Sequence, residues 1–198
     1  MSNPVLAYHF TNGYALRDGQ PLVVGKEYVF DGKPVMCDCG YHASRHVFDA
    51  LQHAPGSVLS LVECRGVEDE DKEKLVCRSR AVIATIDATE LLRAFARAEA
   101  LRVVHLWDAP EIVVRYLKTG DEAIRDAARN AVRDAALSAA RNAALSAARA
   151  TDLASALDAA RNATWSAALS AARDATIKLQ RARLARMVNK AFKEARHE

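Results

Sequence analysis

Two short motifs in the first quarter of the chain gather side chains that could bind a small polar molecule. The first is Tyr8-His9-Phe10-Thr11 and the second is Gly40-Tyr41-His42-Ala43-Ser44. Imidazole and hydroxyl groups both donate and accept hydrogen bonds. The candidate ligand-binding residues are His9, Thr11, Tyr41, His42 and Ser44. The competing interpretation is that His9 and Tyr41 are ordinary strand residues whose hydrogen bonds are satisfied within the fold.

The cysteines offer a second candidate site. The thiols and nearby imidazoles belong to Cys37, Cys39, His42, His46, Cys64 and Cys77. Zinc takes four such ligands in a tetrahedral array, but its usual spacing is Cys-x-x-Cys. Cys64 and Cys77 stand alone within apolar segments. We therefore expect buried, small apolar cysteines and no metal, with a disulfide less expected still in a reducing compartment.

The basic character of the chain lies at its C-terminal end. The net charge is +3, and residues 178–198 hold seven Lys and Arg against two Glu, a sum of +5 that leaves −2 for the rest. These cations could contact phosphates. The helical part that carries them has only Trp165 and Phe192 as aromatic residues. A solvated helix face is the expected interpretation, and nucleic acid is not an expected partner.

Short strands and helices alternate around the two motifs. The predicted strands are Val5–Phe10, Tyr28–Phe30, Gly40–Ala43, Val58–Cys64 and Leu75–Ile86. Residues 67–72 are strongly charged and predict a solvated turn. Ser44 and Thr89 are expected to cap helices, and Pro110 fits the first turn of a helix that ends at Gly120. Strands segregated from helices in this way predict an α+β domain.

The order of these features resembles the ADP-ribosyltransferase fold. An aromatic-His-x-Thr strand, a loop, a Gly-Tyr-x-Ala-Ser strand, a helix and an apolar strand follow one another from Val5 to Cys64. The resemblance implies that His9 and Thr11 grip an NAD-like dinucleotide and that Tyr41 flanks its nicotinamide ring. Ser44 would open the helix behind the site.

Enzymes of that family also use a late acidic residue to stabilise the ribosyl cation. Glu63, Asp87 and Glu90 are suitable by type, but none lies in a recognisable motif. Binding without turnover is therefore at least as expected as catalysis, and the protein is not expected to be an enzyme.

A second resemblance covers most of the chain. The His-Phe-Thr opening and the Gly-Tyr-His-Ala-Ser centre resemble a small uncharacterised domain of bacteriophage and prophage proteins. Residues 110–121 and the alanine-rich repeats after them resemble helical repeats of bacterial immunity proteins. Together they imply a phage or mobile-element origin and a role in host–phage conflict.

The second part of the chain is built from alanine tetrads. All glycines lie at or before Gly120, and every fourth residue from Ala123 to Ala175 is alanine except Thr151 and Ser155. A period of four drifts by ~40° per tetrad around a helix of 3.6 residues per turn. One long helix cannot keep such a stripe on one face, so we expect an antiparallel helical hairpin with its break at Thr151-Asp152. Beyond it, Leu184, Val188, Phe192 and Ala195 align on one helix face.

These observations predict two domains: an α+β ligand-binding domain over residues 1–118 and an all-α alanine-rich module over residues 119–198. No signal peptide or membrane span is expected, so we expect a cytoplasmic protein, in the host cell if phage-encoded. Three functions stay open. The first is an accessory protein that binds a nucleotide-like molecule or a host protein, acting in anti-defence and forming homo-oligomers through its helices. The others are an ADP-ribosyltransferase-like enzyme and a pure interaction or assembly protein.

Overall fold

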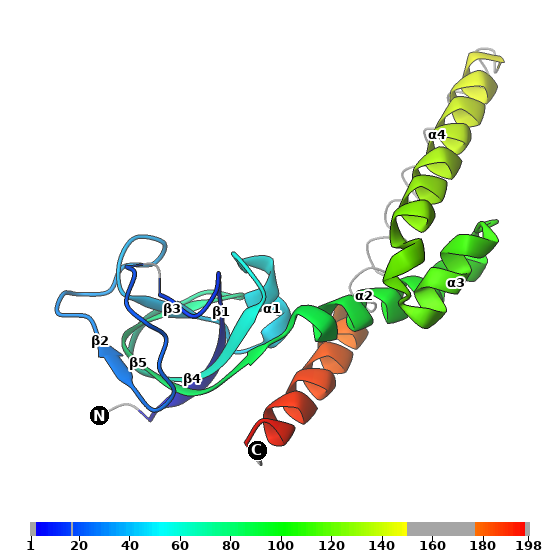
Figure 1. Cartoon of the computed structure of the whole chain (residues 1–198). Helices are drawn as coiled ribbons and strands as arrows, with labels where there is room; N and C mark the ends of the chain where they lie inside the picture. The colour runs from blue at the N-terminus through cyan, green and yellow to red at the C-terminus, as the bar shows by residue number, and fades with distance from the viewer. Residues whose placement is uncertain (1–2, 17, 150–176, 197–198) are drawn as a thin grey trace. The chain divides into compact units, whose positions relative to one another are not determined.

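The computed structural model of the chain describes residues 3–16, 18–149 and 177–196 (Figure 1). The chain forms two compact units. One unit combines Met1–Arg93 with Leu179–Glu198, and the other is Ala94–Lys178. The predicted boundary at residue 118 therefore falls inside the second unit. The C-terminal segment, which we assigned to the helical module, belongs with the sheet.

An antiparallel five-stranded sheet forms the first unit, which confirms the α+β class. Its strands are β1 (Val5–Thr11), β2 (Glu27–Val29), β3 (Tyr41–Ala43), β4 (Val58–Glu70) and β5 (Leu75–Asp87). All five predicted strands are present, with their ends displaced by one or more residues. Strands β4 and β5 form a long hairpin that spans the sheet.

The predicted solvated turn at residues 67–72 is wrong for its first four residues. Strand β4 continues to Glu70, which pairs with Leu75 across the hairpin. The turn itself is closed by the Asp71 carboxylate, which accepts the backbone N–H groups of Glu73 and Lys74 at 2.7 and 2.8 Å. The prediction was wrong because it used the charged side chains alone. The backbone of an exposed strand end still forms hydrogen bonds with the neighbouring strand, whatever side chains it carries.

The hydrogen-bonded strands form a ring. Strand β5 pairs with β4 along one edge and with β2 and β3 along the other. Strand β1 pairs with β4, and an isolated bridge joins Tyr8 of β1 to Ser44, directly after β3. The pairing therefore runs from β1 through β4, β5 and β3 back to β1. This closure brings β1 and β3, which are remote in sequence, to neighbouring positions.

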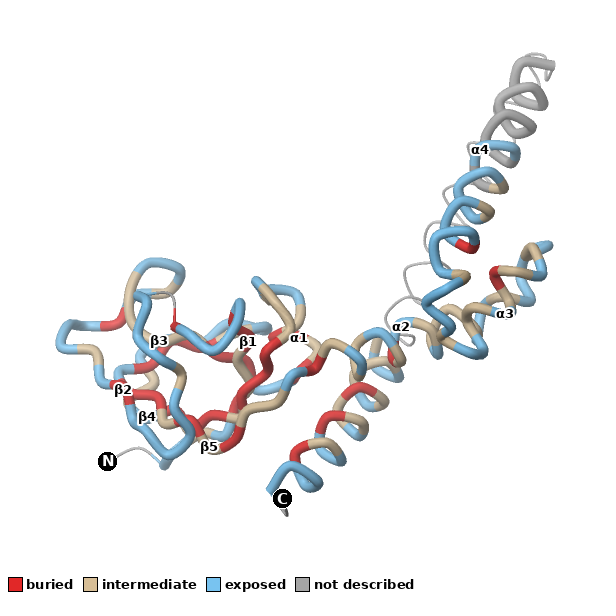
Figure 2. The backbone as a smooth tube through the Cα atoms, in the orientation of Figure 1, coloured by how far each residue is buried: buried red, intermediate tan, exposed pale blue. Residues whose placement is uncertain are grey.

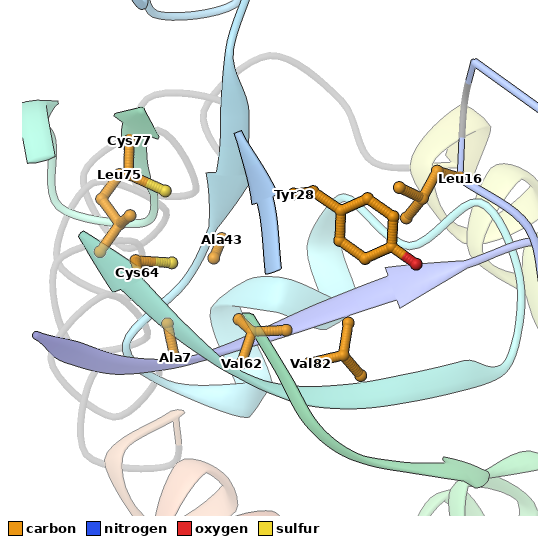
Figure 3. Packing of buried hydrophobic residues seen from close by; sticks show 9 residues of the cluster. All are labelled: Ala7, Leu16, Tyr28, Ala43, Val62, Cys64, Leu75, Cys77 and Val82. Carbon is orange, nitrogen blue, oxygen red and sulfur yellow. The ribbon is translucent and has the colours of Figure 1, made fainter. Parts of the chain in front are cut away.

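One hydrophobic cluster lies on the inner side of this ring (Figure 3). Its members come from every strand and from the loop before β2: Ala7, Leu16, Tyr28, Ala43, Val62, Cys64, Leu75, Cys77 and Val82. Most of them are completely buried. Burying an aliphatic side chain of this size stabilises a fold by about 1.5–3 kcal/mol. The cluster thus fixes the backbones that carry both sequence motifs.

The C-terminal helix, residues 177–194, completes the sheet unit. Leu184 and Val188 are fully inaccessible and Phe192 is buried, so the predicted apolar face is confirmed at these three positions (Figure 2). Ala195 is exposed. Because i, i+4 and i+8 positions share one face of a helix, this stripe is the surface that packs against the unit.

Two polar contacts join this helix to the start of the chain. The hydroxyl of Tyr8 donates to Oδ1 of Asn189 at 3.0 Å. Arg181 Nη2 lies 2.6 Å from Oδ1 of Asp49. Asp49 belongs to α1 (Val47–Gln52) and its side chain is almost fully buried. A buried carboxylate that loses its cation costs about 3–5 kcal/mol, so the ion pair ties α1 to the helix.

The second unit is helical. Helix α2 (Thr89–Val103) enters it, and α3 (Glu111–Thr119) and α4 (Arg125–Arg149) follow, with short 3-10 turns at Val104–Leu106 and Glu122–Ile124. Helix α3 begins after Pro110 and ends at Gly120, whose φ of 67° is left-handed, as predicted. Helix α4 lies where the first arm of the predicted hairpin was expected. The predicted break at Thr151-Asp152 and the second arm lie outside the described residues. Among the described helices, none has the length and apolar character to cross a membrane.

Replacing one residue of the C-terminal stripe should destabilise the sheet unit. Leu184→Ala is expected to cost about 2–5 kcal/mol, because a buried leucine loses its transfer energy and leaves a cavity. Lys190→Ala, on the exposed side of the same helix, is the matched control and should change stability by less than ~0.5 kcal/mol. Hydrogen exchange of the β1 and β4 amides measures both effects locally. Equal exchange in the two variants would show that the helix is not part of the unit.

Candidate functional site

The closure of the ring brings the two sequence motifs together. The backbone N–H of Tyr8 donates to the carbonyl of Ser44 at 2.8 Å, and the reverse bond is 2.9 Å long. Side chains alternate along a strand, so His9 shares the face of the fully buried Ala7. Tyr41 packs against the same inner cluster. His9 and Tyr41 therefore lie on one side of the sheet.

Arg80 of β5 contacts the strand that carries Tyr41 and His42. It is only 3% exposed. Its Nη1 donates to the carbonyl oxygen of His42 at 2.8 Å, and its guanidinium carbon lies 5.1 Å from the centroid of the Tyr41 ring. That separation is within the range of a cation–π interaction. We call His9, Tyr41 and Arg80 the inner polar cluster.

His9 is a neutral member of this cluster. Burial holds the pKa of its imidazole well below the ordinary value, and the positive charge of Arg80 and the neighbouring His42 act in the same direction. A hydrogen bond from His9 to the backbone of His42 raises the pKa, but by less than the other effects lower it. One ring nitrogen is thus a donor and the other an acceptor at neutral pH. His9 remains partly exposed.

Tyr41 forms the outer part of the cluster. Its ring is tilted by 55° against that of Tyr28, with centroids 6.3 Å apart. Burial raises the pKa of the Tyr41 phenol, and the negative charges of Asp18 and Asp31 raise it further. The phenol is therefore protonated at neutral pH and able to donate. Tyr41 remains partly exposed, like His9.

The other predicted site residues make internal contacts. The Thr11 hydroxyl is buried and donates to the carbonyl of Gly13 at 2.8 Å. Nε2 of His42 accepts the backbone N–H of Cys37 at 3.0 Å, so the imidazole is hydrogen-bonded to the loop before β3. Ser44 is buried beside β1. The structure brings together His9 and Tyr41. Thr11, His42 and Ser44 make contacts within the fold near them.

Ser44 does not cap the following helix, so that prediction is wrong. Helix α1 begins at Val47, and its N-terminal flanking residue is His46, which makes no capping hydrogen bond through its side chain. The backbone of Ser44 is engaged in the bridge to Tyr8. Because the Ser44 carbonyl accepts from Tyr8, it does not accept the first hydrogen bond of a helix, and α1 starts later than the sequence pattern indicates.

Two surface hollows lie away from the inner polar cluster. One of about 370 Å³ is lined by Asp31, Gly32, Lys33, Pro34, Glu68 and Arg78. The other, of about 160 Å³, is lined by Arg45, His46, Asp49, Glu70, Asp71, Lys72, Glu73 and Lys74. Both mix acidic and basic groups, and neither includes a member of the cluster.

The cysteines divide into two kinds. Cys64 and Cys77 are buried in the inner core, as predicted. Cys37 is exposed and Cys39 is intermediate, so the prediction of buried cysteines is wrong for both. The Cys37 sulfur lies 2.9 Å from Nζ of Lys74. Within the described ranges, no group of three or more His, Cys, Asp or Glu side chains is arranged to hold a metal ion.

The sequence reasoning missed Arg80. The residue has the same strand parity as Val82, which is the signal that could have marked it as inward-facing. Arg78 has that parity too and is exposed. Alternation alone therefore cannot separate the two arginines.

Comparison with known proteins gives one match. Residues 5–94, less than half of the chain, match a family model described as a domain of unknown function, DUF7666. The matched segment contains all five strands of the sheet and ends within α2. No curated protein matches the chain, and no solved structure matches it.

Acidification should weaken the sheet unit through His9. Its folded pKa lies below the unfolded value of about 6.5, so the unfolded state binds the proton more readily. Stability is full above about pH 6.5 and is lost as the pH falls from there toward the folded pKa. The fall in melting temperature on acidification should be smaller in His9→Gln than in the wild type. His105→Gln, an exposed histidine of the helical unit, should retain the full fall. An unchanged fall in His9→Gln would contradict the buried neutral imidazole.

Proposed function

We propose that the sheet unit binds a small nucleotide-like molecule at the inner polar cluster. The observation that carries this proposal is the convergence of His9, Tyr41 and Arg80 on one side of the ring, from three different strands. A partly exposed tyrosine ring, a neutral imidazole and a guanidinium are the groups that stack on a base and bind its polar substituents. They come from strands held by a packed core, which limits the loss of entropy on binding.

Binding is better supported than group transfer. The acids that could stabilise a ribosyl cation have other partners in this chain: Glu63 pairs with Arg65 at 2.5 Å. Asp87 accepts the backbone N–H of Thr89 at 2.9 Å, and Glu90 pairs with Arg93 at 2.7 Å. A cation formed at the inner polar cluster would meet the positive Arg80. We therefore favour a binding protein over an ADP-ribosyltransferase-like enzyme.

The helical unit completes the proposal as an assembly element. Helix α4 leaves Val132 and Leu137 exposed to solvent. We assign this helix to association with another chain, either a second copy or a host protein. With the resemblance to phage and prophage domains, this suggests an accessory protein that acts in host–phage conflict.

Thermal unfolding with a panel of dinucleotides and cyclic nucleotides tests the binding proposal. A ligand at about one hundred times its Kd should stabilise the unit by about 2.7 kcal/mol and raise the melting temperature. His9→Ala should abolish the rise, because His9 is a member of the proposed binding cluster. His105→Ala is the matched control in the helical unit and should keep it. A rise of equal size in His9→Ala would place the ligand elsewhere and overturn the proposal.

A further inference from the structure

We propose that Arg80 is the anchor of an anion-binding site, so that the ligand carries one phosphate or carboxylate group which enters the inner polar cluster. This inference rests on the proposed function, since it names the chemical class of the molecule bound there. Arg80 lies outside both sequence motifs, and its role comes from its surroundings in the ring.

The first step concerns charge. Arg80 is 3% exposed, and a guanidinium stays protonated at neutral pH. Among the described residues, no carboxylate forms an ion pair with it, whereas Arg45, Arg65, Arg93, Arg102, Arg125 and Arg181 all pair with acids. Burial lowers the pKa of Arg80, which reflects the cost of holding this charge away from water. An uncompensated buried charge costs several kcal/mol. A bound anion would remove that cost.

The second step concerns hydrogen bonds. Nη1 is occupied by the carbonyl of His42 at 2.8 Å. The Nε atom is buried and has no hydrogen-bond partner in the described part of the chain. A buried donor without a partner destabilises the fold. Oxygen atoms of phosphates and carboxylates are the acceptors that fit the edges of a guanidinium best. The free Nε–H group therefore points to a ligand oxygen.

The third step limits the charge that the ligand carries. Arg80 is the single cation of the cluster, because His9 is neutral. Burial raises the pKa of the Tyr41 phenol, and the negative charges of Asp18 and Asp31 raise it further. A molecule with one inner anionic group and a neutral outer part fits this distribution better than a polyanion does.

The internal alternative is a thiolate. Cys64 and Cys77 are buried thiols of the core, and the thiol of Cys77 donates to the carbonyl of Tyr41 at 3.2 Å. The interaction between the two thiols raises the pKa of Cys64 and lowers that of Cys77, on which Arg80 also acts. An ionised Cys77 would neutralise Arg80 without any ligand. Thiolate absorbance in the ligand-free chain at neutral pH that disappears in Cys77→Ala would overturn the proposal.

Calorimetry with adenosine and AMP tests the proposal in the full chain, since the two differ only by a phosphate. We expect AMP to bind at least about tenfold more tightly than adenosine, as one charge-assisted hydrogen bond contributes that much. Arg80→Gln should reduce the affinity for AMP to that for adenosine. Arg78→Gln, two residues away on the same strand and exposed, should keep the preference. Equal affinities in the wild type, or a preference that survives in Arg80→Gln, would overturn the inference and leave the proposed function standing.

A measurement on the wild type keeps the test valid if Arg80→Gln does not fold. Inorganic phosphate and AMP should each raise the pKa of His9, because an anion beside an imidazole favours its charged form. NMR titration of the His9 ring protons measures that pKa. If phosphate raises it but neither adenosine nor AMP binds, the anion site holds and the nucleotide-like ligand is wrong. A pKa that neither anion changes would overturn the inference.

Discussion

A buried guanidinium in an apolar ring is the constraint around which the sheet unit is arranged. Arg80 donates to the carbonyl of His42 and lies over the Tyr41 ring, and His9 binds the backbone of the same His42. These contacts connect β5, β3 and β1, the strands whose pairing closes the ring. A buried positive charge destabilises the fold unless an anion compensates it. A bound anionic ligand would supply that compensation.

The ring depends in turn on a helix from the far end of the chain. The buried stripe of Leu184, Val188 and Phe192 and the contact between Asn189 and Tyr8 complete the unit that begins with β1. Tyr8 is next to His9, so the helix supports the strand that carries the candidate site. The family match ends within α2 and does not include this helix. The sheet unit is therefore larger than the segment that sequence similarity defines.

The strands, α3 and the apolar face of the last helix could be predicted from the sequence, because hydrophobic alternation and Pro or Gly at helix ends are local signals. The closure of the ring could not, since the bridge between Tyr8 and Ser44 joins segments remote in sequence. Because Ser44 is paired with Tyr8 in this closure, helix α1 begins at Val47 and not directly after Ser44. His9 and Tyr41 were predicted as site residues from short motifs. Arg80 was missed because Arg78 has the same parity, and only their burial in the folded sheet distinguishes them.

A crystal structure of the full chain grown with AMP tests the central claim most directly. The account predicts a phosphate oxygen about 2.8 Å from Nε of Arg80, with the base beside Tyr41 and His9. An ordered water at Nε, with AMP absent or bound to another surface, would contradict it.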